Sequence, residues 1–252
     1  MIQQSLKDRL AAREVIVGTF VKTPSPIVAE VLALTPLDCI CLDAEHAPFD
    51  RGTLDTCILA ARAGGMDSLV RIPSAAPEHI LNALDCGATG VVVPHVRSAE
   101  QAEAIAKAAH YGNGGRGYAG SSRAAGYNTV AMAQHQQNSA ARTVVIAQIE
   151  DPEAVDDIEA IARVSGVDAL FIGRVDLTVA YGAESQDDPR VVAAVDRIVT
   201  AAVAADKPVG MFLARVEDVP HWRERGATLF LLGSDHTFLL AGARDLAARV
   251  KH

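Results

Sequence analysis

The chain has no long hydrophobic run, since no apolar stretch approaches the roughly 18–20 residues that a helix needs to cross a bilayer. Residues 1–7 also lack the apolar segment of a secretion signal. The formal net charge of -8 disfavours nucleic acid and anionic membranes as partners. We therefore expect a cytoplasmic protein that binds neither a membrane nor nucleic acid.

Cysteine is scarce, and its spacing excludes two more classes of protein. The chain has four cysteines and no Cys-x-x-Cys pair, which argues against a zinc site and against a disulfide framework. Cys39 and Cys41 share one face of an apolar segment whose other face is also apolar. We predict that all the cysteines are reduced core residues: Cys39, Cys41, Cys57 and Cys86.

Short apolar segments alternate with amphipathic, alanine-rich segments along the chain. Predicted strands occupy 15–20, 39–43, 68–72, 90–94, 144–149, 169–172, 208–212 and 229–232. Predicted helices occupy 26–34, 53–63, 77–86, 99–109, 152–161, 189–205, 219–225 and 238–250. This alternation over 252 residues predicts an α/β protein, a single (β/α)8 TIM barrel that spans 1–252. The alternative is a doubly wound open sheet, but no Gly-x-Gly-x-x-Gly follows the first strand.

Polar residues recur where the predicted strands end. The second, third, fifth and sixth strands are followed or closed by Asp43, His46, Arg71, Gln148, Glu150 and Asp176. In a barrel these positions share the C-terminal rim, which carries the active site in this architecture. Each residue taken alone also has a structural interpretation, because Arg71 could form a surface ion pair, Asp176 could cap a helix and Asp43 could form a turn.

As a set, these residue types fit one kind of chemistry. Glu150 and Asp176 offer hard oxygen ligands for Mg²⁺ or Mn²⁺, which a 2-oxo acid could chelate as well. A guanidinium such as that of Arg71 would stabilise the negative charge of an enolate. His46, held by Asp43 or another acid, could act as the base. The predicted reaction is enolisation followed by the formation or cleavage of a carbon–carbon bond.

Five motifs, in order along the chain, resemble those of a known family. They are Asp-Ala-Glu-His-Ala-Pro at 43–48, Val-Arg at 70–71, Gly-Arg-Gly at 115–117, Gln-Ile-Glu at 148–150 and Phe-Ile-Gly-Arg-Val-Asp-Leu at 171–177. The chain thereby resembles the HpcH/HpaI family of metal-dependent (class II) pyruvate aldolases from residue 17 to residue 249. The resemblance implies an aldolase that reversibly cleaves 4-hydroxy-2-oxo acids to pyruvate or hydroxypyruvate and an aldehyde.

The resemblance also implies a role for each matching residue. Glu150 and Asp176 would bind a divalent metal, Mg²⁺ or Mn²⁺ in the first place and Co²⁺ or Zn²⁺ as alternatives. Arg71 would contact the keto oxygen and the enolate, and His46 with Asp43 would form the proton-transfer dyad. Gln148 would position substrate or a metal-bound water. The amides around Gly173 and Val175 would hold the pyruvate carboxylate. Asp85 would support the base from across a subunit contact.

The sequence departs from the family pattern at several of these positions. Arg174 and Val175 replace a rigid proline and a small residue, Phe20 replaces a tryptophan, and a loop of small polar residues follows Arg116. We predict that Phe20, Arg116, Arg174 and Val175 bind substrate and tune the choice of donor acid and acceptor aldehyde. For His95 we favour a structural role over a place in the pocket, and for His236 the sequence leaves both interpretations open.

Three alternative functions remain open at this point. A Schiff-base aldolase needs a lysine near the rim, and only Lys22 follows a predicted strand. The same metal and enolate chemistry would also serve an oxaloacetate decarboxylase or a lyase acting on a CoA ester. A barrel that only binds a small acid is the third. For assembly, family resemblance implies a homo-oligomer, a hexamer built from dimers, with the C-terminal helix exchanged between subunits.

Overall fold

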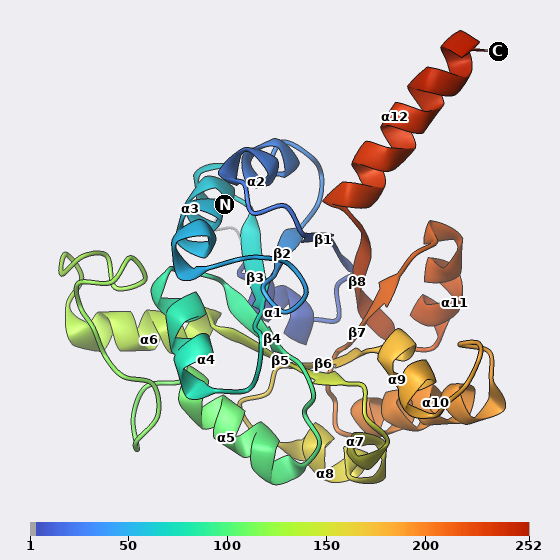
Figure 1. Ribbon diagram of the computed structural model, residues 1–252. Helices are drawn as coiled ribbons and strands as arrows, with labels where there is room; N and C mark the ends of the chain where they lie inside the picture. The colour runs from blue at the N-terminus through green and yellow to red at the C-terminus, as the bar shows by residue number, and fades with distance from the viewer. Residues whose placement is uncertain (1–3, 252) are drawn as a thin grey trace.

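The computed structural model describes residues 4–251 and shows a closed barrel of parallel strands surrounded by helices (Figure 1). The strands follow one another around the barrel in chain order, and the first pairs with the eighth. They are β1 Ile16–Val21, β2 Cys39–Asp43, β3 Asp67–Arg71, β4 Gly90–Val93, β5 Val144–Ile149, β6 Ala169–Ile172, β7 Val209–Leu213 and β8 Ala227–Ser234. The predicted TIM barrel is confirmed, and the open sheet is excluded by the pairing of β1 with β8.

The helices lie outside the barrel, with one exception at its base. In chain order they are α1 Leu6–Ala11, α2 Pro26–Leu32, α3 Arg51–Ala63, α4 Pro77–Asp85, α5 Ala99–Ala109, α6 Met132–Arg142, α7 Pro152–Asp156, α8 Ile158–Arg163, α9 Arg174–Ala180, α10 Pro189–Ala204, the 3-10 turn η1 Val216–Asp218, α11 Val219–Glu224 and α12 Asp235–Lys251. The sequence did not predict α1, α6 or α9, and the helix predicted over 152–161 is divided into α7 and α8. No helix within 4–251 is long and apolar enough to cross a lipid bilayer.

Two hydrophobic cores hold the barrel together. The inner core fills the barrel with side chains such as Phe20, Leu69, Ile146 and Phe171, and Leu6 and Leu10 of α1 close its lower end. The larger outer core lies between the strands and the surrounding helices. All four cysteines are free and buried, as predicted, in one or the other core. The tightly packed interior leaves the open upper end of the barrel as the place for polar side chains.

The last helix differs from the others because it leaves the barrel. In Figure 1, α12 projects away from the remaining structure, and Asp235 at its start is its one buried residue within 235–251. Its exposed apolar side chains include Phe238, Leu239, Leu240 and Leu246. The Asp235 carboxylate accepts hydrogen bonds from the backbone amides of Lys22, at 2.8 Å, and Thr23, at 3.0 Å. The start of α12 is therefore fixed to the segment that follows β1.

Candidate active site

A cavity of about 660 Å³ opens where the barrel strands end. Its wall includes residues at or just after the ends of β1, β3, β5, β6, β7 and β8. Of the residues predicted for the site, the cavity is lined by Phe20, His46, Arg71, Gln148, Gly173, Arg174, Val175 and Asp176. Lys22 and His236 line it as well. The C-terminal rim thus brings together side chains from segments far apart in the sequence.

Arg71 is held in the cavity wall by a buried carboxylate. Its Nε and Nη2 donate to Oδ1 and Oδ2 of Asp43 at 2.9 and 2.7 Å, and the Asp43 side chain is fully buried. Lys22 Nζ lies 3.3 Å from Asp43 Oδ2, and the ring of Phe20 lies 4.5 Å from the Arg71 guanidinium carbon. Burial alone would raise the pKa of Asp43, but its bonds to Arg71 lower that pKa below the ordinary value. Arg71 is therefore a fixed, charged donor rather than a mobile surface residue.

The structure gives His46 a different partner from the one that the resemblance implies. The contact of His46 with Asp43 is made by its backbone amide, which donates to Asp43 Oδ1 at 3.2 Å. The imidazole Nε2 lies instead 3.6 Å from Oε2 of Glu45, and the side chain of His46 is 54% exposed. A dyad between the His46 ring and Asp43 is thus not formed in this structure, because Arg71 and Lys22 occupy the carboxylate of Asp43.

Glu45 is the site residue that the sequence reasoning missed. Its Oε2 lies 3.4 Å from Arg71 Nε, and its Oε1 lies 3.9 Å from His95 Nε2. Oε2 is buried without a hydrogen-bond partner among the described residues, and burial raises the pKa of Glu45. One signal was available in the sequence, because residues two apart at the end of a strand share a face, and Glu45 follows Asp43 at that spacing.

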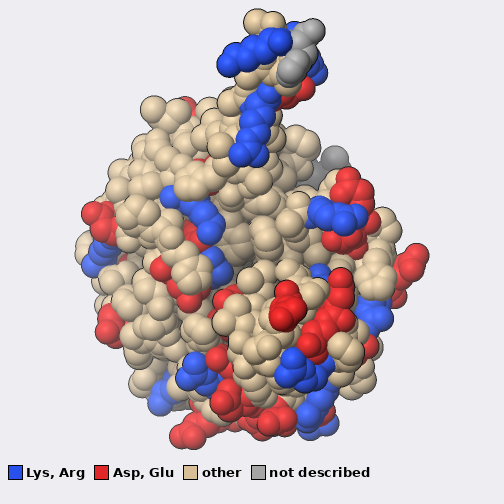
Figure 2. All heavy atoms as spheres, turned by 45° about the vertical axis from the view of Figure 1, so that its right-hand side comes forward, with Lys and Arg blue, Asp and Glu red and all other residues tan. Residues whose placement is uncertain are grey.

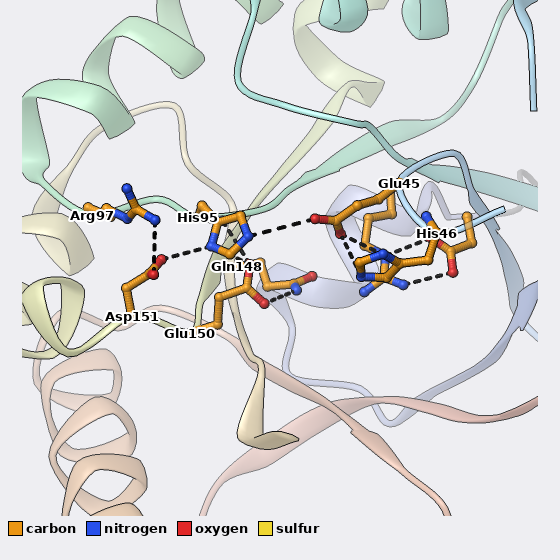
Figure 3. A network of polar contacts seen from close by, with 9 residues as sticks. Glu45, His46, His95, Arg97, Gln148, Glu150 and Asp151 are labelled. Carbon is orange, nitrogen blue, oxygen red and sulfur yellow. Dashed lines mark hydrogen bonds and ion pairs between the residues drawn. The ribbon is translucent and has the colours of Figure 1, made fainter. Parts of the chain in front are cut away.

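His95 was expected to be structural, and the structure places it in a polar network instead (Figure 3). Its backbone amide donates to Glu150 Oε1 at 2.9 Å, and its Nδ1 lies 3.0 Å from Oδ2 of Asp151. Arg97 Nη2 donates to the other oxygen of Asp151 at 3.1 Å. Partial burial acts to lower the pKa of His95, but Asp151 and the nearby glutamates raise it. In Figure 3 the ring of His95 lies between Asp151 and Glu45.

The residues around Glu150 fit a divalent cation. Ligand atoms of Glu45, His95 and Glu150 lie within 4.8 Å of one another. Glu45 Oε2 and Gln148 Oε1 are buried acceptors without a donor in the described chain, and Gln148 Nε2 donates to Glu150 Oε2. Burial, together with the negative charge of Asp176, raises the pKa of Glu150. A cation would satisfy these unpaired oxygens and favour the charged forms of Glu45 and Glu150.

Asp176 lies at this rim as predicted, but inside its helix rather than at the N-cap position that the sequence also allowed. It is the third residue of α9, whose N-cap is Gly173, so the interpretation of Asp176 as a helix cap is wrong. Its side chain lines the cavity and acts electrostatically on both Glu45 and Glu150. The residues that the structure brings together as possible metal ligands are Glu45, His95 and Glu150, and Asp176 is not among them.

Asp85 and Arg116 lie outside this cavity. Arg116 is buried, its Nη2 donates to Asp85 Oδ1, and its guanidinium carbon lies 4.9 Å from the centre of the Tyr111 ring. Asp85 borders a second hollow, together with Arg51 and Arg123. In the described chain, Arg116 is thus a partner of Asp85 and does not line the main cavity, so its contact with substrate stays a prediction.

The closed parallel barrel and its polar rim place this protein among the α/β barrel enzymes. Sequence comparison identifies its family. Residues 17–241 match the family described as HpcH/HpaI aldolase/citrate lyase. The chain belongs to this family. It is 34% identical over 247 residues to 5-keto-4-deoxy-D-glucarate aldolase of Escherichia coli O6:H1 (strain CFT073), covering 97% of this chain and 96% of that protein.

Similar solved structures cover nearly the whole chain. A HpcH/HpaI aldolase/citrate lyase family protein from Burkholderia cenocepacia J2315 has a TM-score of 0.93 and 30% identity, with 99% of this chain and 100% of that chain covered. The citrate synthase SbnG has a TM-score of 0.88 and 30% identity, with 99% and 98% covered. Proteins with similar sequence identity to this chain thus have different activities. Membership of the family therefore indicates the type of chemistry, and the substrate has to be inferred from the site.

Proposed function

We propose that the protein is a class II aldolase that reversibly cleaves 4-hydroxy-2-oxo acids into pyruvate, or hydroxypyruvate, and an aldehyde. The observation that carries this proposal is the fixed guanidinium of Arg71, which lies 3.4 Å from Glu45 and lines the same cavity as His46. Aldol cleavage leaves an enolate of the 2-oxo acid, whose oxygen needs a rigid positive partner. The similarity to 5-keto-4-deoxy-D-glucarate aldolase supports the same chemistry.

We infer that a divalent metal is held by Glu150 and Asp176. Glu45 and His95 lie close enough to Glu150 to serve as further ligands. Bound there, the metal would act as a Lewis acid on the 2-oxo acid. The carboxylates favour Mg²⁺ or Mn²⁺, whereas the His95 nitrogen would also suit Co²⁺ or Zn²⁺. Gln148, whose Oε1 is buried and unpaired among the described residues, would orient substrate or a water molecule at this cluster.

The roles of the surrounding residues follow from their positions. Arg71 would donate to the keto oxygen of the substrate and gain most when that oxygen becomes anionic. His46, exposed at the cavity and close to Glu45, would move the proton of the methyl carbon. By family resemblance, the amides around Gly173 and Val175 would hold the pyruvate carboxylate, and Asp85 would act from a neighbouring subunit.

We infer that the protein assembles with copies of itself, as a hexamer of three dimers by family resemblance. Phe238, Leu239, Leu240 and Leu246 are each about half or more exposed on α12. An apolar surface of this kind on a projecting helix is better stabilised by a partner than by water. Light scattering after gel filtration tests the assembly, and a monomer at micromolar concentration would contradict it.

Exchange of the methyl protons of pyruvate in D₂O tests the proposed reaction, since it requires enolisation but no aldehyde. Loss of the methyl signal in proton NMR, dependent on added Mg²⁺ or Mn²⁺ and abolished by chelation, is the expected result. A barrel that only binds a small acid would show no exchange. Exchange that survives chelation, together with trapping of pyruvate on Lys22 by borohydride, would establish the Schiff-base mechanism instead.

The second candidate function uses the same residues on a different bond. A lyase acting on a CoA ester, or an oxaloacetate decarboxylase, would also need a stabilised enolate, and the similarity to the citrate synthase SbnG keeps this type of reaction in consideration. Comparing the rate of oxaloacetate decarboxylation with the rate of cleavage of a 4-hydroxy-2-oxo acid distinguishes the two. We expect the aldol cleavage to have the higher kcat/KM.

A further inference from the structure

Lys22 lies on the cavity wall and contacts the carboxylate that holds Arg71. Its Nζ lies 3.3 Å from Oδ2 of Asp43, the same oxygen that accepts a hydrogen bond from Arg71 Nη2 at 2.7 Å. The Asp43 side chain is fully buried, whereas the side chain of Lys22 is 33% exposed and lines the cavity. One buried carboxylate is therefore shared by two cations.

The pairing of the strands explains why these three groups meet. In the register of β1 and β2, Val21 pairs with Leu42. The residues that follow these two, Lys22 and Asp43, therefore lie at the same level of the barrel. Asp43 pairs in turn with Arg71 of β3. The ends of three adjacent strands thus place a cation, a carboxylate and a second cation in one row.

The backbone from which the Lys22 side chain extends is fixed as well. The Lys22 amide donates to Oδ1 of Asp235 at 2.8 Å, and the Thr23 amide donates to Oδ2 of Asp235 at 3.0 Å. The side chain of Thr23 also lies 3.1 Å from His236 Nε2. A fixed backbone lowers the entropy that a long side chain loses when its ammonium is held beside a carboxylate.

Arg71 is close to more negative charge than its own positive charge can balance. Its Nε and Nη2 donate to Asp43, and Oε2 of Glu45 lies 3.4 Å from the same Nε. With both carboxylates charged, these three groups carry a net negative charge, which would oppose the formation of an enolate beside them. The positive charge of Lys22 on Asp43 makes the whole group neutral.

The cavity as a whole is more basic than the protein. Its charged lining consists of the cations Lys22, Arg71, Arg174 and Arg215 and the carboxylates Asp176 and Asp218. The chain carries a net charge of -8. Figure 2 shows basic side chains beside the hollow below the projecting helix, whereas acidic side chains gather toward the lower edge. Positive charge is thus concentrated at the cavity, against the sign of the protein as a whole.

We propose that Lys22 is a positioning residue for Arg71, which offsets the charge of Asp43 and thereby strengthens the stabilisation of the enolate by Arg71. This inference rests on the proposed aldolase function and adds to it a residue that acts through the buried ion pair of Asp43 and Arg71. A Schiff-base mechanism would require Lys22 to leave Asp43 as a neutral amine, so the two roles exclude each other.

Exchange of the methyl protons of pyruvate tests this role without an aldehyde. In Lys22→Gln, the kcat of exchange should fall about tenfold, which is less than the loss of a donor that touches the oxyanion, because Lys22 acts through Asp43 and is partly exposed. The KM for pyruvate should change much less, since the enolate charge develops only in the transition state. An unchanged kcat in Lys22→Gln would overturn the proposal.

Chemical restoration of the ammonium group separates its charge from its packing. Lys22→Cys should lose exchange as Lys22→Gln does. The thiolate of this variant displaces bromide from 2-bromoethylamine, which gives a side chain close to lysine in length and charge. This product should recover most of the lost kcat, whereas iodoacetamide, which adds a neutral group, should recover none. Equal recovery with both reagents, or with neither, would contradict the proposal.

Three controls accompany these measurements. The native cysteines are buried, and wild-type protein treated with each reagent shows whether their alkylation matters. Lys107→Gln removes an exposed charge at the end of α5, outside the cavity lining, and should leave exchange unchanged. An equal loss in Lys107→Gln would show an effect of net charge alone and would refute the role of Lys22. Borohydride should trap no pyruvate on Lys22, and trapping would overturn the proposal.

The wild-type protein distinguishes failure of this inference from failure of the proposed function. Exchange in the wild type that Lys22→Gln retains in full would refute the role of Lys22 and leave the aldolase function in place. Absence of exchange in the wild type, with Mg²⁺ or Mn²⁺ added, would refute both.

Discussion

Gly173 leaves the space that Glu150 occupies. A Cβ atom on Gly173 would lie 2.7 Å from both Cβ and Oε2 of Glu150. This distance is too short for a contact of a Cβ atom with either atom, and Glu150 is itself buried between Gln148 and the amide of His95. The end of β6 therefore limits where the Glu150 carboxylate can lie.

The first prediction concerns this contact. Gly173→Ala should displace the Glu150 carboxylate and lower the affinity for Mn²⁺ by about tenfold or more, on the scale of losing a well-placed metal neighbour. Electron paramagnetic resonance of free Mn²⁺ measures the affinity directly. Gly117→Ala is the control, because a Cβ there meets nothing within 4 Å. Unchanged Mn²⁺ affinity in Gly173→Ala would show that Glu150 is free to move.

The second prediction ranks the metal ligands. Glu150→Gln and Asp176→Asn should each lower Mn²⁺ affinity strongly, because each removes a charged oxygen ligand. Glu45→Gln and His95→Gln should also weaken Mn²⁺ binding if Glu45 and His95 are ligands. The same Mn²⁺ titration ranks the loss of affinity in the four variants. Full activity of Glu150→Gln and Asp176→Asn after exhaustive chelation would refute the metal site.

The third prediction concerns Arg71. Arg71→Ala should slow pyruvate methyl exchange by on the order of 10²-fold or more, the scale of removing one donor to an oxyanion. It should also lower the free energy of unfolding by about 3–5 kcal/mol, because Asp43 remains buried with only Lys22 beside it. Urea unfolding separates the two effects, and Arg62→Ala, exposed on α3, is the control. A loss of pyruvate affinity with unchanged exchange would contradict the role of Arg71 in the enolate.

The fourth prediction is a pH dependence of stability in the metal-free protein. Burial raises the pKa of Glu45 above the ordinary 4.5, so the folded state holds a proton that the unfolded state has already released. The stabilisation is complete below that value and is lost as pH rises through the higher pKa of the folded state. The Tm in EDTA should therefore fall as pH rises above about 4.5, and fall less in Glu45→Gln.

Two controls accompany this measurement. Glu103→Gln, exposed on α5, should leave the slope of Tm against pH unchanged. Saturating Mg²⁺ should reduce or reverse the slope, because a bound cation favours the charged carboxylate. A Tm that rises with pH in EDTA would contradict the raised pKa of Glu45.

The fifth prediction concerns the donor acid. The Phe20 ring packs beneath Arg71 and against Phe171 and Phe212, with ring centres 6.5 and 6.0 Å apart, and it lines the cavity. Hydroxypyruvate should be accepted as well as pyruvate, since a pocket that tolerates a hydroxyl group cannot reject it strongly. Phe20→Trp should shift the preference toward pyruvate because an indole is larger. Addition of both donors to glycolaldehyde measures this, and a wild-type preference for pyruvate above roughly 10³-fold would refute it.

The sequence predicted the barrel because its strands are short apolar runs bounded by turn residues, and they alternate with amphipathic helical segments along the chain. The helices that it missed lack that signal. Met132–Arg142 buries only His135 and has no apolar face, and Arg174–Ala180 spans only two turns. The residues of the rim could be predicted as a group because the architecture collects the strand ends at one edge.

The contacts within the site could not be predicted in the same way. His46 and Asp43 are close in the sequence, but the forked guanidinium of Arg71, 28 residues away, binds the carboxylate more completely. The spacing of Glu45 from Asp43 hinted at the same rim, but neither Glu45 nor His95 could be linked to Glu150 from the sequence, because that grouping depends on how the strand ends meet. Pairing between side chains from different strands depends on barrel geometry, which a single sequence does not contain.

The carboxylate of Asp235 has a mechanical consequence. Its two oxygens each hold one backbone amide of the segment that follows β1, and the same segment carries Lys22 into the cavity. The Asp235 carboxylate thus links the start of α12 to the backbone from which Lys22 extends into the cavity. A force that tilts the projecting helix is transmitted to the mouth of the barrel through these two bonds and through the contact of His236 Nε2 with Thr23 Oγ1 at 3.1 Å, so the helix works as a lever that pivots at its first turn.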